Sequence, residues 1–262
     1  MVELNYMDHV AVVKLNRGVT NALNLALFQG LADKLRRAAS DPEVSAVVLT
    51  SASEKFFSIG FDIPGLFQLP REEFAAIYRD FNLTWMELYT LPKPTVAVIT
   101  GHAIAGGCIL ALCCDYRLMS SGRKSSGEVG ERDTLIGLNE IKLGVPVPFL
   151  VDCILRDLVG TRTARDIVET GEFFTAEQAL GMGLVDRVTP QDEVLPEAIE
   201  RARMLGTLSQ QAYRIMKQNR VESTAQRILG QWEDRQRMFV DRWYSDEARL
   251  RLNAAMEKFQ PR

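Results

Sequence analysis

The stretch that decides the fold is Thr95-Val-Ala-Val-Ile-Thr100 followed by Gly101-His-Ala-Ile-Ala-Gly106-Gly107-Cys108. The first run is apolar or β-branched, which predicts a buried strand. The glycines predict a turn, and residues 108–113 are apolar enough for a buried helix. The first N–H groups of a helix are unpaired, and glycine lets a ligand approach them closely. The turn can therefore hold an oxyanion. Alternatively, the glycine pair only lets helix and strand pack closely.

Strand and helix patterns alternate around this unit. Residues 10–15 and 46–50 predict strands, while Leu27, Leu31 and Leu35 share the face of one helix and residues 72–91 form a second. Apolar strands separated by helices indicate crossover connections and a largely parallel sheet. The sequence therefore predicts an α/β core over residues 1–190.

Strand signals disappear after residue 188. Helices are predicted over residues 192–205, 209–218, 224–243 and 246–259, after a short helix with the capping box Thr175-Ala-Glu-Gln178. We therefore expect a helical region over residues 191–262. Its aromatic side chains are too many for a solvated face, so they should pack on the body of the protein or on a neighbouring subunit: Trp232, Phe239, Trp243 and Tyr244.

Composition excludes several classes of protein. The 262 residues are 47% hydrophobic and 25% charged, with a net charge of −3. This balance excludes a disordered chain and gives no electrostatic footprint for nucleic acid. The helical region contains basic residues interspersed with acids, which predicts a solvated face rather than an RNA site: Arg201, Arg203, Arg214, Lys217 and Arg220.

Cysteine and histidine usage narrows the chemistry further. The cysteines lie in apolar surroundings without a C-x-x-C pair, so we expect buried reduced thiols: Cys108, Cys113, Cys114 and Cys153. Only His9 and His102 are present, so no metal site is expected, and both are interpreted as packing or hydrogen-bonding residues. Without a long apolar run or a signal peptide, we expect no membrane contact and a cytoplasmic location.

Residues 120–134 differ from the rest of the chain. They combine serines, glycines and charged residues with one aliphatic side chain, Val129. Such a composition predicts a long, exposed and mobile loop.

Two further segments could carry chemistry. One is the turn Lys55-Phe-Phe-Ser-Ile-Gly60-Phe61-Asp62, which follows the strand at residue 46. The other is Ile136-Gly-Leu-Asn139-Glu140-Ile-Lys-Leu-Gly144, in which Glu140 has apolar neighbours. Apolar surroundings raise the pKa of a carboxyl group and suit a general base or acid. The alternative is an ordinary surface glutamate at a helix start.

Taken together, these motifs resemble the crotonase superfamily, the enoyl-CoA hydratase/isomerase family. The similarity runs along essentially the whole chain, through Asn21-Ala22-Leu23, the turn at residues 57–62, the glycine segment 101–108 and Cys114-Asp115-Tyr116-Arg117. The resemblance implies a ββα spiral core with a C-terminal helical region used for trimerisation. Within the family, residues 105–108 and 136–140 are most similar to Δ3,Δ2-enoyl-CoA isomerases.

The resemblance also implies roles for particular residues. The backbone N–H groups of Phe61 and Gly106 would form an oxyanion hole for the thioester oxygen, and Glu140 would be the catalytic base. The CoA thioester is the substrate, with no other cofactor. The residues implied in substrate binding are Ser58, Ile59, Gly60, Phe61, Asp62, Gly106 and Asn139.

The family pattern distinguishes between two reactions. Hydratases of the family carry a first carboxylate two residues after the last glycine of the turn, where this chain has Ile109. A single carboxylate suffices to move one proton from C2 to C4, so we expect isomerisation of 3-enoyl-CoA to 2-trans-enoyl-CoA, in a trimer or hexamer. The alternatives are a hydratase using Glu128 or Glu131, a hydrolase, or a non-catalytic acyl-CoA- or RNA-binding member.

Overall fold

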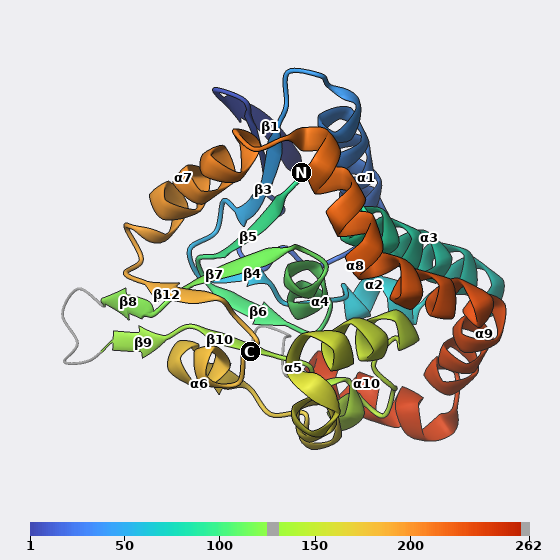
Figure 1. The fold of residues 1–262 in the computed structure, drawn as a ribbon. Helices are drawn as coiled ribbons and strands as arrows, with labels where there is room; N and C mark the ends of the chain where they lie inside the picture. The colour runs from blue at the N-terminus through green and yellow to red at the C-terminus, as the bar shows by residue number, and fades with distance from the viewer. Residues whose placement is uncertain (125–130, 258–262) are drawn as a thin grey trace.

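The computed structural model describes residues 1–124 and 131–257, and its centre is a six-stranded sheet (Figure 1). The strands β2, β3, β5, β7 and β12 run parallel, and β1 pairs antiparallel with β2. All residues of β3 and β5 are buried, as their apolar sequences predict. The strand order is β1 (Val2–Met7), β2 (Val10–Leu15), β3 (Ala46–Ser51), β5 (Thr95–Ile99), β7 (Tyr116–Ser120) and β12 (Arg187–Thr189).

A second, four-stranded sheet consists of very short strands. Its order is β11 (Phe174–Thr175), β10 (Leu135–Gly137), β6 (His102–Ile104) and β4 (Phe56–Ser58). The strands β4, β6 and β10 run parallel. The chain passes from β3 to β4 and from β5 to β6 before each helix, which is the ββα spiral implied by the resemblance. The predicted crotonase-type α/β fold is confirmed.

Helices cover both faces of the large sheet. α1 (Leu25–Ser40) packs against α3 (Arg71–Tyr89), and α4 (Gly106–Leu112) is completely buried. On the other face, α7 (Val194–Gly206) contributes Val194, Ala198 and Ala202 to a second apolar cluster with β2, β3 and β5. The remaining helices before β12 are α2 (Ile63–Phe67), the 3₁₀-helix η1 (Glu140–Leu143), α5 (Phe149–Thr170) and α6 (Ala176–Gly181).

The C-terminal helices differ in their bounds from the prediction. A single helix, α8 (Gln210–Gly230), spans the predicted gap between residues 218 and 224, because the buried side chains Val221 and Thr224 continue its apolar face. The chain breaks instead after Gly230, between α8 and α9 (Trp232–Trp243), and α10 (Asp246–Glu257) follows. The capping box at Thr175 is confirmed.

The aromatic residues of the tail pack on the body of the same chain. The ring of Trp243 stacks on Phe74 of α3 with centroids 4.5 Å apart, and Phe239 stacks on Tyr78 at 4.1 Å. Figure 1 shows α8, α9 and α10 along the side of the molecule that carries α2, α3 and α5. The division at residue 190 and the trimerisation role of the tail stay predictions.

The basic residues of the tail do not all face solvent. Lys217 is 3% exposed and donates from Nζ to Asp115 Oδ2 at 2.8 Å. Arg201 lies over the ring of Tyr116, 4.1 Å from its centroid. The expectation of a solvated face is therefore wrong for Lys217, because an acid more than 100 positions earlier in sequence compensates its charge.

Residues 120–134 contain more regular structure than predicted. β8 (Gly122–Lys124) and β9 (Glu131–Asp133) pair antiparallel, so the ends of this segment form a hairpin rather than a loop. Glu128 lies outside the described residues, as does the side chain of Glu131, and their suggested role as a second acid stays a prediction.

The cysteines are all buried free thiols, as predicted. The Nδ1 atom of His102 accepts a hydrogen bond from the N–H group of Leu135 at 3.1 Å, which ties β6 to β10. Among the described residues, no helix is long and apolar enough to cross a membrane, and no group of three His, Cys, Asp or Glu side chains could hold a metal ion.

Candidate active site

The three segments singled out in the sequence meet at one edge of the small sheet. The turn at Gly60 follows β4, Gly106 follows β6, and Glu140 follows β10. Because β4, β6 and β10 are parallel neighbours, their carboxyl ends lie side by side. The fold therefore brings together two glycine turns and a glutamate that are up to 80 positions apart in sequence.

Two backbone N–H groups at this edge have no acceptor among the described residues. Within the described part of the chain, neither the N–H group of Phe61 nor that of Gly106 donates a hydrogen bond. The two turns are in close contact, since a Cβ atom on Gly60 would lie 3.0 Å from the nitrogen of Gly106. Gly60 also has a φ of +93°, which glycine adopts without strain. The arrangement suits an oxyanion that accepts from both N–H groups.

The first turn is held from inside the protein. Ser58 is completely buried, and its hydroxyl donates to the backbone oxygen of Asn21 at 2.8 Å and accepts from the N–H group of Gly60 at 3.1 Å. Asn21, with φ of +44°, donates from Nδ2 to the carbonyl of Phe57 at 3.1 Å. The Ser58 side chain thus fixes the shape of the turn, whereas the resemblance implied contact with substrate.

The outer side of the turn is tied to residues 20–23. The N–H group of Ile59 donates to Thr20, and that of Asp62 donates to Leu23. The Asp62 carboxylate accepts from Arg17 at 2.6 Å, and both side chains are partly exposed. Of the implied binding residues, Ile59, Phe61, Asp62 and Asn139 are partly accessible from solvent, whereas Ser58, Gly60 and Gly106 are buried.

The side chain of Phe61 belongs to an aromatic cluster. Its ring is parallel to that of Trp85, with centroids 6.1 Å apart, and meets Trp243 edge-on at 6.2 Å. Phe81 of α3 lies at 5.2 Å. The Phe61 ring therefore anchors the peptide whose N–H group is free, because moving the peptide would disrupt packing with α3 and α9.

The geometry of the glycine pair at the start of α4 fits both interpretations considered above. A Cβ atom on Gly107 would lie 2.2 Å from the carbonyl oxygen of Ser58, so Gly107 allows the close packing of α4 against β4. Gly106 supplies the free N–H group. Ala105 before them has a φ of +47°, a conformation that a residue with a Cβ atom rarely adopts.

Glu140 is a buried carboxyl group and not a surface residue. It is 6% exposed, and its Oε2 atom has no hydrogen-bond partner among the described residues. Burial raises the pKa of Glu140 to about 7, opposed only by a backbone hydrogen bond. The preceding Asn139 has a buried Oδ1 atom that also lacks a partner in the described structure. Glu140 can therefore gain or lose a proton near neutral pH.

The titratable neighbours of Glu140 keep their protons. Burial raises the pKa of the Cys108 thiol and of the Tyr78 hydroxyl, and the charge of Glu140 raises both further. Of these three groups, only Glu140 can serve as a base near neutral pH.

Comparison with known proteins agrees with this geometry. A family model described as enoyl-CoA hydratase/isomerase matches residues 6–262. The chain belongs to the enoyl-CoA hydratase/isomerase family. Enoyl-CoA delta isomerase 1, mitochondrial, of Mus musculus is 29% identical over 260 residues, which are 99% of this chain and 87% of that protein. A putative enoyl-CoA hydratase of Thermus thermophilus is 38% identical over 199 residues, 72% of each chain.

Solved structures of the family extend the similarity to three dimensions. The crystal structure of human mitochondrial delta3-delta2-enoyl-CoA isomerase matches with a TM-score of 0.92 at 27% identity, covering 98% of this chain and 97% of that one. The relatives include both isomerases and hydratases by name, so membership of the enoyl-CoA hydratase/isomerase family leaves the choice of reaction to the residues of the site.

Some residues that shape the site were not predicted from sequence. Asn21 was quoted as part of a motif, but its buried contacts with Ser51 and Phe57 were not anticipated. Trp243 was expected to pack on the body of the protein or on a neighbouring subunit, without any connection to Phe61, and the contact of Trp85 with Phe61 was not predicted. The position of Asn21 before Ala-Leu was a sequence signal that could have indicated its role. The aromatic contacts of Phe61 depend on tertiary structure alone, so no sequence signal indicated them.

Proposed function

We propose that the protein is an isomerase that converts 3-enoyl-CoA thioesters to 2-trans-enoyl-CoA. The observation that carries the proposal is that Glu140 is a buried carboxyl group with no charged partner among the described residues, located at the same sheet edge as two free N–H groups. Such a set can supply one proton carrier and one binding site for negative charge.

The reaction is a 1,3 proton shift. The Glu140 carboxylate removes a proton from C2, and the electrons of that C–H bond form an enolate whose charge is on the thioester oxygen. The N–H groups of Phe61 and Gly106 donate to this oxygen, and one such donor is worth ~3–4 kcal/mol in comparable enzymes. Protonated Glu140 then returns the proton to C4, and the double bond moves from C3–C4 to C2–C3.

The pKa of Glu140 suits both halves of this reaction. A group with a pKa of about 7 is substantially ionised at neutral pH and is still acidic enough to return its proton. Asn139 and the turn that contains Ile59, Gly60 and Asp62 would contact the substrate. The CoA thioester is the only cofactor-like group that this scheme needs.

Hydration would need a second acid. At the family position of that acid, this chain has Ile109, which is buried in α4 among apolar residues. An isoleucine cannot activate or orient water, so the hydratase hypothesis requires an acid from elsewhere in the chain.

The test is a side-by-side assay with two substrates of equal chain length. With a 3-enoyl-CoA we expect formation of the conjugated 2-trans-enoyl-CoA, followed by its ultraviolet absorbance and by mass spectrometry in D₂O. With the 2-trans-enoyl-CoA we expect negligible 3-hydroxyacyl-CoA. Hydration faster than isomerisation would refute the proposal and favour the hydratase alternative, and release of free CoA would favour a hydrolase.

Self-association as a trimer or hexamer is part of the proposal, and sedimentation analysis tests it. A cytoplasmic location is proposed as well, although the mouse relative is named as mitochondrial. Fractionation of the source cells would decide between the two compartments.

A further inference from the structure

Glu140 lies in a short segment, residues 140–146, whose only regular structure is a 3₁₀-helix of four residues. Glu140 is the first residue of η1, a 3₁₀-helix without a side-chain cap. The segment ends at Gly144, whose φ of +77° reverses the chain, and the N–H group of Val145 donates back to the carbonyl of Glu140 at 3.2 Å. The position of Glu140 is therefore coupled to the position of Gly144.

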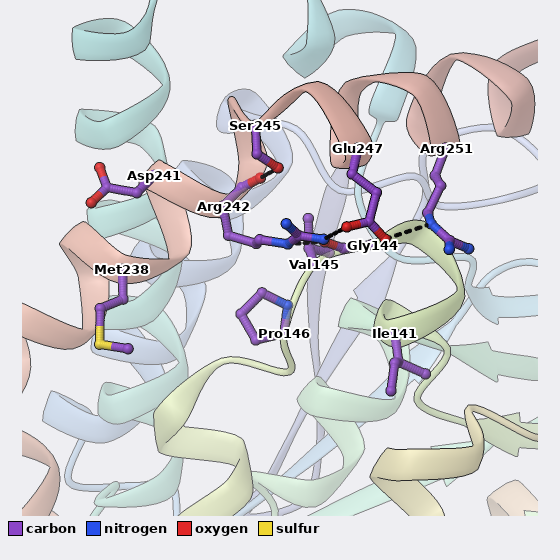
Figure 2. A pocket seen from close by; sticks show the side chains of 10 residues that line it. All are labelled: Ile141, Gly144, Val145, Pro146, Met238, Asp241, Arg242, Ser245, Glu247 and Arg251. Atoms are coloured by element: carbon purple, nitrogen blue, oxygen red, sulfur yellow. Dashed lines mark hydrogen bonds and ion pairs between the residues drawn. The ribbon is translucent and has the colours of Figure 1, made fainter.

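Arg242 of α9 holds this end of the segment. Its Nε atom donates to the carbonyl oxygen of Gly144 at 2.7 Å, and its Nη2 atom donates to Glu247 of α10 at 2.5 Å (Figure 2). Glu247 also accepts from Arg251 at 3.1 Å. The guanidinium is thus fixed by a carboxylate on one side and fixes a main-chain carbonyl on the other.

α10 supports the same glycine from behind. A Cβ atom on Gly144 would lie 2.8 Å from Cδ of Arg251 and 3.2 Å from Cα of Ala248. Gly144 is therefore enclosed between α9 and α10, two helices that follow it by about 100 positions in sequence.

Beside this contact, Ile141 and Pro146 of the segment border a cavity that is open to solvent, whereas Val145 is buried in the core. The cavity has a volume of about 740 Å³ and is lined by Ile141, Val145 and Pro146 on one side and by Met238 and Arg242 on the other. Figure 2 shows Pro146 and Ile141 facing this space below the row of charged residues. Since side chains do not fill the space, the polar contact of Arg242 matters more for fixing the segment.

We propose that Arg242 is a positioning residue for Glu140, and that α9 and α10 thereby form part of the active site of the same chain. This inference rests on the proposed function of Glu140. Without the Arg242 contact, residues 140–146 can shift toward the cavity, the glutamate loses its alignment with the two N–H groups, and water reaches it.

The experiment compares Arg242→Met with Arg237→Met, a matched substitution on the same helix. Arg237 is exposed and pairs with Asp234 of the same helix. For Arg242→Met we expect at least a tenfold lower kcat and a KM within about threefold of the original. The pKa of Glu140, followed by carboxyl ¹³C NMR in the absence of substrate, should fall from about 7 toward its ordinary value. Arg237→Met should leave all three quantities unchanged.

Arg242→Lys provides the second variant. Lysine keeps the charge and can donate to Gly144, but it lacks the planar fork that places Nε at Gly144 and Nη2 at Glu247, so we expect values between those of the original protein and Arg242→Met. Unchanged kcat and Glu140 pKa in folded Arg242→Met, with only a lower melting temperature, would overturn the inference. Because the NMR titration needs no turnover, it decides the inference even if the isomerase proposal fails in the two-substrate assay.

Discussion

Two buried carboxylates of this protein have opposite environments. Asp115, with a side chain 4% exposed, accepts hydrogen bonds from Lys217 at 2.8 Å, from Tyr213 at 3.1 Å and from the N–H group of Thr95 at 2.9 Å, and it pairs with Arg220. Glu140 is buried to a similar degree, yet its Oε2 atom has no partner among the described residues.

The two environments move the pKa in opposite directions. Burial alone would raise both values, but the charge and hydrogen bonds of Lys217 and Arg220 hold the pKa of Asp115 below its ordinary value. In the described part of the chain, no cation of this kind compensates Glu140, whose pKa rises to about 7. The two acids therefore differ in role because only one has cationic partners. Asp115 stays ionised and joins α8 to the core, whereas Glu140 can exchange a proton near neutral pH.

The largest effect should come from Glu140→Gln. An amide cannot accept the C2 proton, so we expect isomerisation to fall by ~10²–10⁴-fold or more. Binding of a saturated acyl-CoA, measured by calorimetry, should be nearly unchanged. Wild-type turnover by this variant would show that another group is the base.

Asp115→Asn should have the opposite profile. It leaves Lys217 buried without a full counter-charge, and breaking a buried pair costs ~3–5 kcal/mol. Urea unfolding should show this loss, while the folded fraction keeps its activity. A smaller loss in the double variant Asp115→Asn, Lys217→Met would confirm that the stranded charge is the cause, and equal losses in the single and double variants would contradict it.

The dependence of stability on pH should also separate the two acids. The pKa of Glu140 is raised by folding, so its contribution is complete below about 4.5 and is lost as the pH rises through about 7. At 1.36 kcal/mol per pKa unit, that loss is roughly 3 kcal/mol. The pKa of Asp115 is lowered by folding, so its contribution is present above about 3.8 and is lost as the pH falls further.

Urea unfolding between pH 5 and pH 8 measures the Glu140 contribution, and Glu140→Gln should remove it. Activity should rise over the same range with a midpoint near 7, because only the ionised carboxylate removes a proton. An identical stability profile for the variant and the original protein would contradict the assigned pKa.

The smallest effect is expected at a third acid, Asp62. Its pair with Arg17 is partly exposed, with side chains 22% and 29% accessible. Exposed pairs contribute ~0.2–1 kcal/mol, so Arg17→Met should lower stability by no more than this amount in thermal unfolding. A loss of stability as large as that of Asp115→Asn would contradict this expectation, because it would mean that solvent exposure does not weaken the Asp62–Arg17 pair relative to the buried Asp115–Lys217 pair.

Sequence patterns were sufficient where the signal is local. The apolar runs of β3 and β5, the glycines after β4 and β6, and the apolar neighbours of Glu140 predicted the α/β core and the three segments of the site. The prediction that one acid and two N–H groups carry out the reaction came from the family resemblance. It depended on Ile109 at the position of the second acid and on the similarity of residues 105–108 to isomerases.

Patterns failed where a residue depends on a distant partner. Lys217 has the sequence surroundings of a surface residue, and its burial depends on Asp115. In the same way, nothing near Arg242 in sequence indicates the carbonyl of Gly144. The bounds of α8 and the β8–β9 hairpin were missed because tertiary packing and strand pairing override weak local preferences.

The free N–H groups of Phe61 and Gly106 belong to the main chain, which has a consequence for divergence of the protein. Amino-acid replacement cannot delete a peptide amide except by introducing proline, so the proposed ability to hold a thioester oxygen would be inherited with the backbone path itself. Replacements at a few positions around it, such as 109 and 140, could then redirect the proton chemistry while leaving this ability intact.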